Sequence, residues 1–193
     1  MEKETKMIMS EQNFLPKMFF DKLSEIVNGA GFHWFFNSSD LIYIKNVPCT
    51  EKPIKHFMFT HSLFRNEITP DGTLIHGESS GWSNIFIPII YFISEKVKVT
   101  QLIRMKLNLY TNQKKKIIHS PHYDINNPET HKPFKNITTA ILNFTTCDGG
   151  TKIGDKIYAS KANEVLIFNN TIKHSGITQT DTQKRIVLNI NWR

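Results

Sequence analysis

The residues best suited to chemistry are His122 and Asp124, in the stretch SPHYDINNPETHKPF, and His174 farther along the chain. Residues two apart on an extended backbone face the same way, so the side chains of His122 and Asp124 should lie roughly 7 Å apart along the strand, within reach of one metal ion. Such a pair alone is weak evidence, because it can arise by chance. Two neutral imidazoles and one carboxylate leave three adjacent coordination positions open, which suits ferrous iron with a bidentate substrate and dioxygen.

Arg185 is a fourth residue that bears on this chemistry. It begins the stretch RIVLNINW, in which alternation separates two faces. One face holds Ile186, Leu188, Ile190 and Trp192, and the other holds Arg185, Val187, Asn189 and Asn191. If the second face lines the interior, Arg185 is a buried charge that requires a partner. A dicarboxylate co-substrate would supply that partner through a bidentate pair of hydrogen bonds.

The elements that must position these residues are strands, because the period of the sequence is two from Val97 onward. In QLIRMKLNLY, the apolar Ile103, Met105, Leu107 and Leu109 alternate with Arg104, Lys106, Asn108 and Tyr110. Further strands are expected over 137–145, 156–159, 164–168 and 185–192, with turns at 147–150 and 169–171. Many short strands at this spacing predict an antiparallel sandwich or barrel.

The first half of the chain is expected to be mainly helical. Phe19, Leu23, Ile26 and Val27 recur at helical spacing between Pro16 and Gly29. A second helix is expected from Ser83, with Pro88 tolerated only within a first turn. A strand over 41–44 and a turn over 69–73 are also expected. The sequence thus predicts one domain over 1–193, with a mainly helical support region over 1–96 packed on one sheet of a β-core over 97–193.

Composition narrows the class of protein without fixing its function. The 193 residues carry a formal net charge of +7, and the basic residues are scattered apart from Lys114 to Lys116, so a solvated surface is favoured over a nucleic-acid interface. Cys49 and Cys147 lack the spacing of a disulfide framework or a zinc site. The longest apolar run, Ile85 to Ile93, is too short to cross a bilayer. We therefore expect a cytoplasmic protein without a membrane partner.

The order of these residues resembles a known family. His122, Asp124, His174 and Arg185, on a β-rich C-terminal half, resemble the iron(II)- and 2-oxoglutarate-dependent dioxygenases, over about Leu102 to Trp192. Gly149-Gly150-Thr151 is similar to the glycine turn of the prolyl-hydroxylase-like branch, and the overall pattern looks like uncharacterised phage-type oxygenases. The resemblance implies a mainly β fold with supporting helices, built on a double-stranded β-helix, or jelly roll, of cupin-like type.

The resemblance also implies roles for single residues. His122, Asp124 and His174 would hold Fe(II), and Arg185 would bind the distal carboxylate of 2-oxoglutarate. Asn108 and Tyr110 resemble an Asn-x-Tyr pair that contacts this co-substrate in the nucleobase-repair branch. Asn143 stands where prolyl-hydroxylase-like members commonly have a tyrosine that reaches the same carboxylate, and Val187 stands where many members have a serine. Both departures bear on how the carboxylate would be held.

The implied activity is hydroxylation of an unactivated C–H bond of a prolyl or other protein residue, or of a free amino acid. It would consume dioxygen and convert 2-oxoglutarate to succinate and carbon dioxide. One alternative is modification or dealkylation of a nucleobase, and another is a non-catalytic jelly-roll module that binds metal.

Residues around the motif receive lesser roles. His119 is an odd number of residues from His122 and would face the other way on an extended strand, so it is not expected to bind the metal. His131 is a candidate substrate contact, because loops at the mouth of a site often set specificity. The loops over 72–82 and 126–136 are expected at that mouth.

Overall fold

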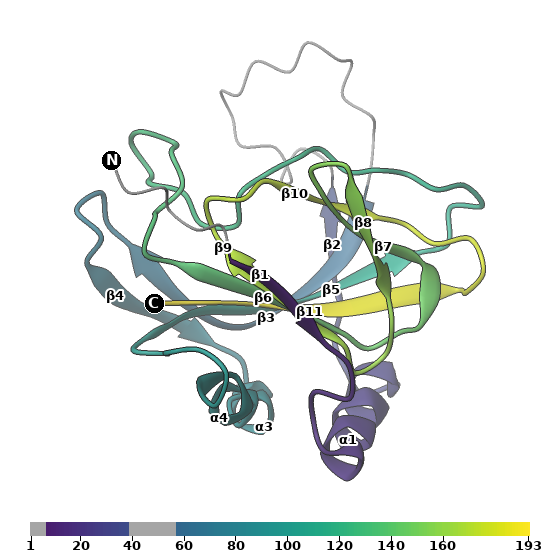
Figure 1. The fold of residues 1–193 in the computed structure, drawn as a ribbon. Helices are drawn as coiled ribbons and strands as arrows, with labels where there is room; N and C mark the ends of the chain where they lie inside the picture. The colour runs from purple at the N-terminus through teal and green to yellow at the C-terminus, as the bar shows by residue number, and fades with distance from the viewer. Residues whose placement is uncertain (1–6, 39–56) are drawn as a thin grey trace.

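The structure, a computed structural model, describes residues 7–38 and 57–193. Within these ranges the chain forms antiparallel strands in two sheets and three helices (Figure 1). The strands are β1 (Ile8–Glu11), β2 (Phe35–Ser38), β3 (Phe57–Ile68), β4 (Leu74–Ser79), β5 (Leu102–Thr111), β6 (Thr138–Asn143), β7 (Cys147–Ile153), β8 (Lys156–Ser160), β9 (Val165–Asn169), β10 (His174–Ile177) and β11 (Lys184–Trp192). The helices are α1 (Lys17–Asn28), α3 (Ser83–Phe86) and α4 (Ile89–Ser94).

The larger sheet has the strand order β1-β9-β6-β11-β5-β3-β2, with β4 paired to β3, and the smaller has the order β10-β7-β8. In Figure 1 the three helices lie below the larger sheet and the smaller sheet lies above it. Single bridges from Ile118 to Ile177 and from His122 to His174 lay the segment before the metal motif along β10. This antiparallel two-sheet arrangement is consistent with the predicted jelly roll.

Strand β11 lies near the middle of the larger sheet and separates the core from the site. Its residues Ile186, Leu188, Ile190 and Trp192 are fully buried in one hydrophobic cluster, as alternation predicted. The same cluster contains Phe20, Leu23 and Val27 of α1, Phe86 of α3, and Ile89 and Ile93 of α4. The opposite face of β11 carries Arg185, Val187, Asn189 and Asn191, so the polar residues of this strand lie on the side away from the helices.

The prediction that residues 1–96 are mainly helical is wrong for the described part, which holds four strands beside the three helices. Strand β3 was missed because a register irregularity between Ser62 and Phe64 interrupts its alternation. The predicted helix from Ser83 is divided in two, and Pro88 lies at the N-terminal end of α4, where a missing N–H costs little. The predicted strand over 41–44 lies outside the described residues.

Two predicted turns had different outcomes. The turn over 69–73 is confirmed: Gly72, at φ +89°, donates its N–H to the Thr69 carbonyl at 2.8 Å. The turn predicted over 147–150 is wrong, because these residues begin β7. The glycines there serve close packing: a Cβ at Gly149 would lie 2.8 Å from the Ile177 oxygen and 3.2 Å from Cδ of Arg185. Small residues on β7 therefore leave room for the arginine.

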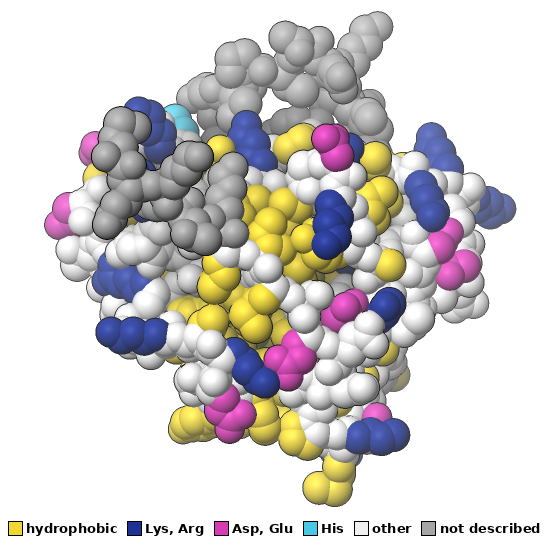
Figure 2. Space-filling view, viewed as in Figure 1, with side chains coloured by type: hydrophobic (Ala, Val, Ile, Leu, Met, Phe, Trp, Pro, Cys, Tyr) yellow, Lys and Arg dark blue, Asp and Glu magenta, His cyan; other side chains and the backbone are white. Residues whose placement is uncertain are grey.

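The distribution of charged side chains on the surface agrees with the scattered basic residues of the sequence. Figure 2 shows lysine and arginine side chains spread among aspartate and glutamate on one face, with hydrophobic side chains gathered near its middle. Among the described residues, no helix combines the length and apolar character needed to cross a bilayer. Cys147 is buried and makes no disulfide, while Cys49 lies outside the described residues.

Candidate metal centre

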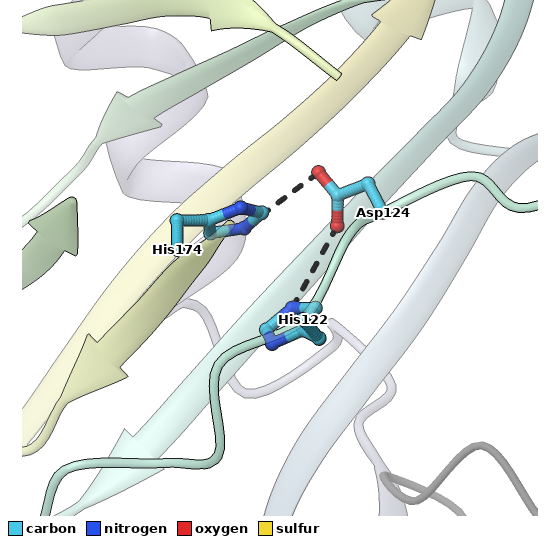
Figure 3. A group of neighbouring side chains, drawn as sticks. All are labelled: His122, Asp124 and His174. Atoms are coloured by element: carbon cyan, nitrogen blue, oxygen red, sulfur yellow. Dashed lines mark ion pairs between the residues drawn. The ribbon is translucent and has the colours of Figure 1, made fainter. Parts of the chain in front are cut away.

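The fold brings His122, Asp124 and His174 together. One possible ligand atom from each lies within 4.8 Å of the other two, so a single ion can be shared among them. Figure 3 shows the two imidazoles directed at the Asp124 carboxylate, His174 from β10 and His122 from the segment beside it. Each Nε2 is 3.9 Å from a different oxygen of Asp124. The donor set is the two-histidine, one-carboxylate type that suits ferrous iron.

Both histidines are prepared to act as ligands. Nδ1 of His122 lies 3.0 Å from the Ser120 carbonyl, which can only accept, so Nδ1 carries the proton and Nε2 is free to bind metal. Burial lowers the pKa of His174 to about 4, although the negative charge of Asp124 opposes this shift. His174 is therefore neutral at pH 7, as a metal ligand must be.

Asp124 is held on several sides. Nη2 of Arg104 lies 2.9 Å from Oδ1, and the amides of Asn189 and Asn191 donate to Oδ1 at 3.4 Å and to Oδ2 at 3.2 Å. Burial acts to raise the pKa of Asp124, but Arg104 and the two histidines outweigh it and hold this pKa far below its usual range. The carboxylate is therefore ionised and fixed in orientation.

Asn191 offers a test of this support. Its amide also donates to Thr139 at 2.9 Å, so it anchors Asp124 to the sheet. We expect Asn191→Ala to weaken Mn(II) binding roughly 10- to 100-fold, the usual effect of losing a residue that orients a metal ligand. Calorimetric titration with Mn(II) measures this, with the exposed Asn136→Ala as the matched control. Equal affinity in the two variants would contradict the assigned role.

Arg185 is a buried cation at the other end of the same cavity. It is 1% exposed, and one guanidinium nitrogen lies 3.5 Å from both the Asn143 and the Thr151 side-chain oxygens. Its Nε and Nη1 have no hydrogen-bond partner among the described residues, and burial lowers its pKa. No carboxylate in the described ranges pairs with it. An uncompensated buried charge is costly, so this end of the cavity is suited to an anionic ligand.

The cavity joins the two ends of the site. It has a volume of about 210 Å³ and is lined by the three candidate ligands and by Arg185, Asn108 and Tyr110. The guanidinium lies 5.2 Å from the centroid of the Tyr110 ring, and Oδ1 of the buried Asn108 has no partner among the described residues. Asn143 is not among the lining residues; it accepts from Arg185 and from Ser160 at 3.0 Å. Asn143 thus supports the arginine from behind.

Other lining residues were given no binding role from the sequence, although Asn126 lies in a loop expected at the mouth and Val187 was noted as a departure from the family. They are Asn37, Met58, Arg104, Lys106, His119, Tyr123, Asn126, Ile141, Thr151, Gly176, Val187 and Asn189. Alternation had a signal for several of them, because Arg104 and Lys106 share a face with Asn108, and Asn189 shares one with Arg185. Thr151 was noted only as the end of the stretch that resembles a glycine turn, and its strand was taken for a turn.

His119 lines the cavity although it was expected to face the other way from His122. The bridges Ile118–Ile177 and His122–His174 enclose one more residue on the first segment than on β10. One extra residue reverses the side-chain direction relative to a regular ladder. His119 is buried and its ring meets that of Tyr110 edge-on, with centroids 5.3 Å apart. It remains outside the group that can share one metal.

His131 is placed differently. It is exposed, at φ +55°, and is not among the described residues that line the cavity. A contact with substrate outside the cavity stays a prediction.

Comparisons with known proteins agree with this architecture. No family model and no curated protein matches the sequence. Among solved structures, a 2OG-Fe(II) oxygenase family oxidoreductase from Burkholderia pseudomallei is similar at a TM-score of 0.63 and 9% identity, over 97% of this chain and 84% of that one. The viral collagen prolyl hydroxylase of Paramecium Bursaria Chlorella virus-1, in a 2OG complex, has a TM-score of 0.53 at 9% identity over 98% and 96%.

A third neighbour carries a different activity. The epimerase SnoN, in complex with Fe3+, alpha ketoglutarate and nogalamycin RO, is similar at a TM-score of 0.55 and 11% identity, over 96% of this chain and 78% of that one. At such identities the likenesses establish the fold.

Proposed function

From a fold shared with 2-oxoglutarate- and iron(II)-dependent oxygenases, we propose that this protein is such an oxygenase and hydroxylates an unactivated C–H bond. One observation carries the proposal: Arg185 is buried without an anionic partner among the described residues, in the same cavity as a two-histidine, one-carboxylate cluster. The cavity therefore offers a separate place for each end of a dicarboxylate that also chelates a metal.

Each residue of the site has a separate proposed role. His122, Asp124 and His174 would hold Fe(II), and Arg185 would bind the distal carboxylate of 2-oxoglutarate, with Asn143 and Thr151 fixing its guanidinium. Iron and 2-oxoglutarate, when bound, would supply dioxygen activation coupled to release of succinate and carbon dioxide. Arg104, Asn189 and Asn191 keep Asp124 ionised and oriented throughout.

Asn108 and Tyr110 complete the proposed co-substrate site. Both face the cavity from β5, where Tyr110 is directly opposite Arg185 in the sheet register and Asn108 is opposite Val187. Buried polar groups require partners, and the amide oxygen of Asn108 is available to a ligand or to a water beside it. At the Val187 departure, the polar side chains directly opposite are Asn108 on β5 and Asn143 on β6.

The proposed substrate is a prolyl or other protein residue, or a free amino acid. Support comes from the likeness to a structure named as a collagen prolyl hydroxylase. Modification of a nucleobase is the second candidate, and the observation that favours it is the Asn108–Tyr110 pair inside the cavity. Binding to single-stranded nucleic acid that falls steeply with salt would support the second candidate, and its absence would count against it.

Turnover of the co-substrate tests the proposed class. The purified protein with Fe(II), dioxygen and 2-oxoglutarate is expected to form succinate, and removal of iron with a chelator is expected to stop it. Mass spectrometry then searches peptides, amino acids and nucleic acids for products one oxygen heavier. Absence of succinate with any metal would refute the oxygenase and leave a jelly-roll module that binds metal.

Domain structure and location complete the proposal. We infer one domain over 1–193, because strands from both halves pair within the larger sheet. We propose a cytoplasmic location, since the two cysteines of the sequence lack the spacing of a disulfide framework.

A further inference from the structure

The charges that line the cavity do not balance. Its described lining contains three cationic side chains, those of Arg104, Lys106 and Arg185, and one carboxylate, that of Asp124. Under the proposed function, a ferrous ion adds two positive charges and 2-oxoglutarate adds two negative charges, so these two ligands cancel. Two positive charges then remain. Because charges in a confined cavity require compensation, the last ligand to arrive should be an anion.

Lys106 is the cation that the proposed function leaves without a partner. Arg104 is paired with Asp124 at 2.9 Å, and Arg185 is assigned to the distal carboxylate of 2-oxoglutarate. The other carboxylate of 2-oxoglutarate would bind at the metal. The co-substrate therefore has no further charged group that could pair with Lys106. Among the described residues, none forms an ion pair or a hydrogen bond with the Lys106 ammonium.

The position of Lys106 is close to the metal and away from Arg185. In the register of β5 with β11, Lys106 is opposite Asn189, whose amide contacts Asp124. Arg185 is opposite Tyr110, four residues farther along β5. On its other side Lys106 is opposite Ser62 of β3, which brings no charge. The backbone of Lys106 is therefore opposite a residue that contacts Asp124, and its side chain lines the same cavity as the metal cluster.

The local field is positive around this lysine. Burial lowers the pKa of Lys106 to about 8, and Arg104 and Arg65 add to this effect while Asp124 opposes it. Arg65 is exposed and lies opposite Arg104 on β3, with Glu78 of β4 opposite it in turn. A basic strip thus runs from the metal cluster toward the surface, and its exposed end already faces a carboxylate. Among the described residues, the carboxylate that acts on Lys106, at the inner end, is that of Asp124, which is already paired with Arg104.

We propose that Lys106 binds an anionic group, a carboxylate or a phosphate, on the primary substrate and so places the reacting carbon beside the metal. This inference rests on the proposed function, because it assigns the other cations to the metal ligand and the co-substrate. A lysine ammonium is a compact charge that attracts carboxylate and phosphate alike, so Lys106 alone does not distinguish them. The cavity of about 210 Å³ has to hold the co-substrate too, which limits the group beside Lys106 to a small one.

A titration with small acids tests the inference. The full chain is loaded with Mn(II) and 2-oxoglutarate without oxygen, and then titrated with the free L-amino acids and with nucleoside 5′-monophosphates. Each acid has a counterpart that lacks the anionic group, the amino-acid amide or the nucleoside. We expect at least one acid to bind tenfold or more tightly than its counterpart, and the arm in which it is found identifies carboxylate or phosphate as the recognised group.

Variants assign this binding to Lys106. Lys106→Met is expected to weaken the selected acid at least tenfold while Mn(II) and 2-oxoglutarate affinities stay within twofold, and Lys106→Arg is expected to keep the preference for the acid. Lys161→Met, at an exposed lysine, is the matched control. The melting temperature of each metal-free variant shows that the fold is kept.

Other results separate this inference from the proposed function. Equal binding of the acids and of the counterparts that lack the anionic group, no binding of any acid, or weaker binding of 2-oxoglutarate by Lys106→Met would each overturn the role of Lys106. Failure of the wild-type protein to bind 2-oxoglutarate would instead refute the proposed function.

Discussion

His122→Ala is expected to abolish stoichiometric iron binding and reduce succinate formation to the level of a metal-free sample. Three protein side chains would bind the ion, and removing His122 leaves His174 and Asp124 alone to hold it. His122 is the cleanest of the three to remove, because its side chain is 33% exposed and that of Asp124 is 3% exposed. Its loss leaves no buried charge behind, so the free energy of unfolding should change by less than about 1 kcal/mol.

The control for this substitution is His76→Ala, at an exposed position on β4. Iron content is measured by elemental analysis after reconstitution and desalting, and stability by chemical denaturation without metal. Full iron content in His122→Ala would remove this histidine from the metal site. Asp124→Ala is a poorer test, because it would leave Arg104 unpaired and destabilise the fold as well.

Arg185→Met is expected to change binding and stability in opposite directions. Losing one partner of a buried charge pair costs about 2–5 kcal/mol, so the dissociation constant for 2-oxoglutarate should rise roughly 30-fold to several thousand-fold. In the ligand-free protein the same change removes an uncompensated buried cation and keeps its apolar volume. The free energy of unfolding should therefore rise by about 1 kcal/mol, which raises the melting temperature by about 2–4 °C.

Calorimetry with Mn(II) and 2-oxoglutarate measures the affinity, and thermal unfolding of the metal-free protein measures the stability. Arg185→Lys is the companion variant: it retains the charge without the planar fork and should lie between wild type and Arg185→Met in affinity. Lower stability of ligand-free Arg185→Met would mean that Asn143, Thr151 and the other groups around the guanidinium already compensate its charge.

Much of the site could be predicted because it lies on strands with regular alternation. In β11 the period of two put Arg185 opposite the core residues, and in β5 it put Asn108 and Tyr110 on one face, as the structure confirms. The same rule applied to all positions would have added Lys106 and Asn189. These residues were not predicted to belong to the site, because alternation gives the direction of a side chain and does not identify the residues beside it.

The rest could not be predicted because irregular strands carry no clear period. In β3 the buried residues Met58, His61 and Leu63 are unevenly spaced, because Met58 lines the cavity whereas Leu63 belongs to the core beside the helices, and a register irregularity follows between Ser62 and Phe64. The orientation of His119 depends on one extra residue opposite β10, which is a property of the pairing and absent from the local pattern. The strand at Gly149 was interpreted as a turn because glycines usually mark turns.

The shared use of β11 by the core and the site restricts how this chain can change its length. A deletion of one residue near the start of 185–192 would turn core side chains such as Leu188 toward the cavity and draw polar side chains into the apolar cluster, since a slip of one reverses every following side chain. Insertions in the exposed stretch over 128–132 meet no such constraint, because no ladder continues through it. Relatives of this chain are thus expected to vary in length there and to keep β11 at constant length.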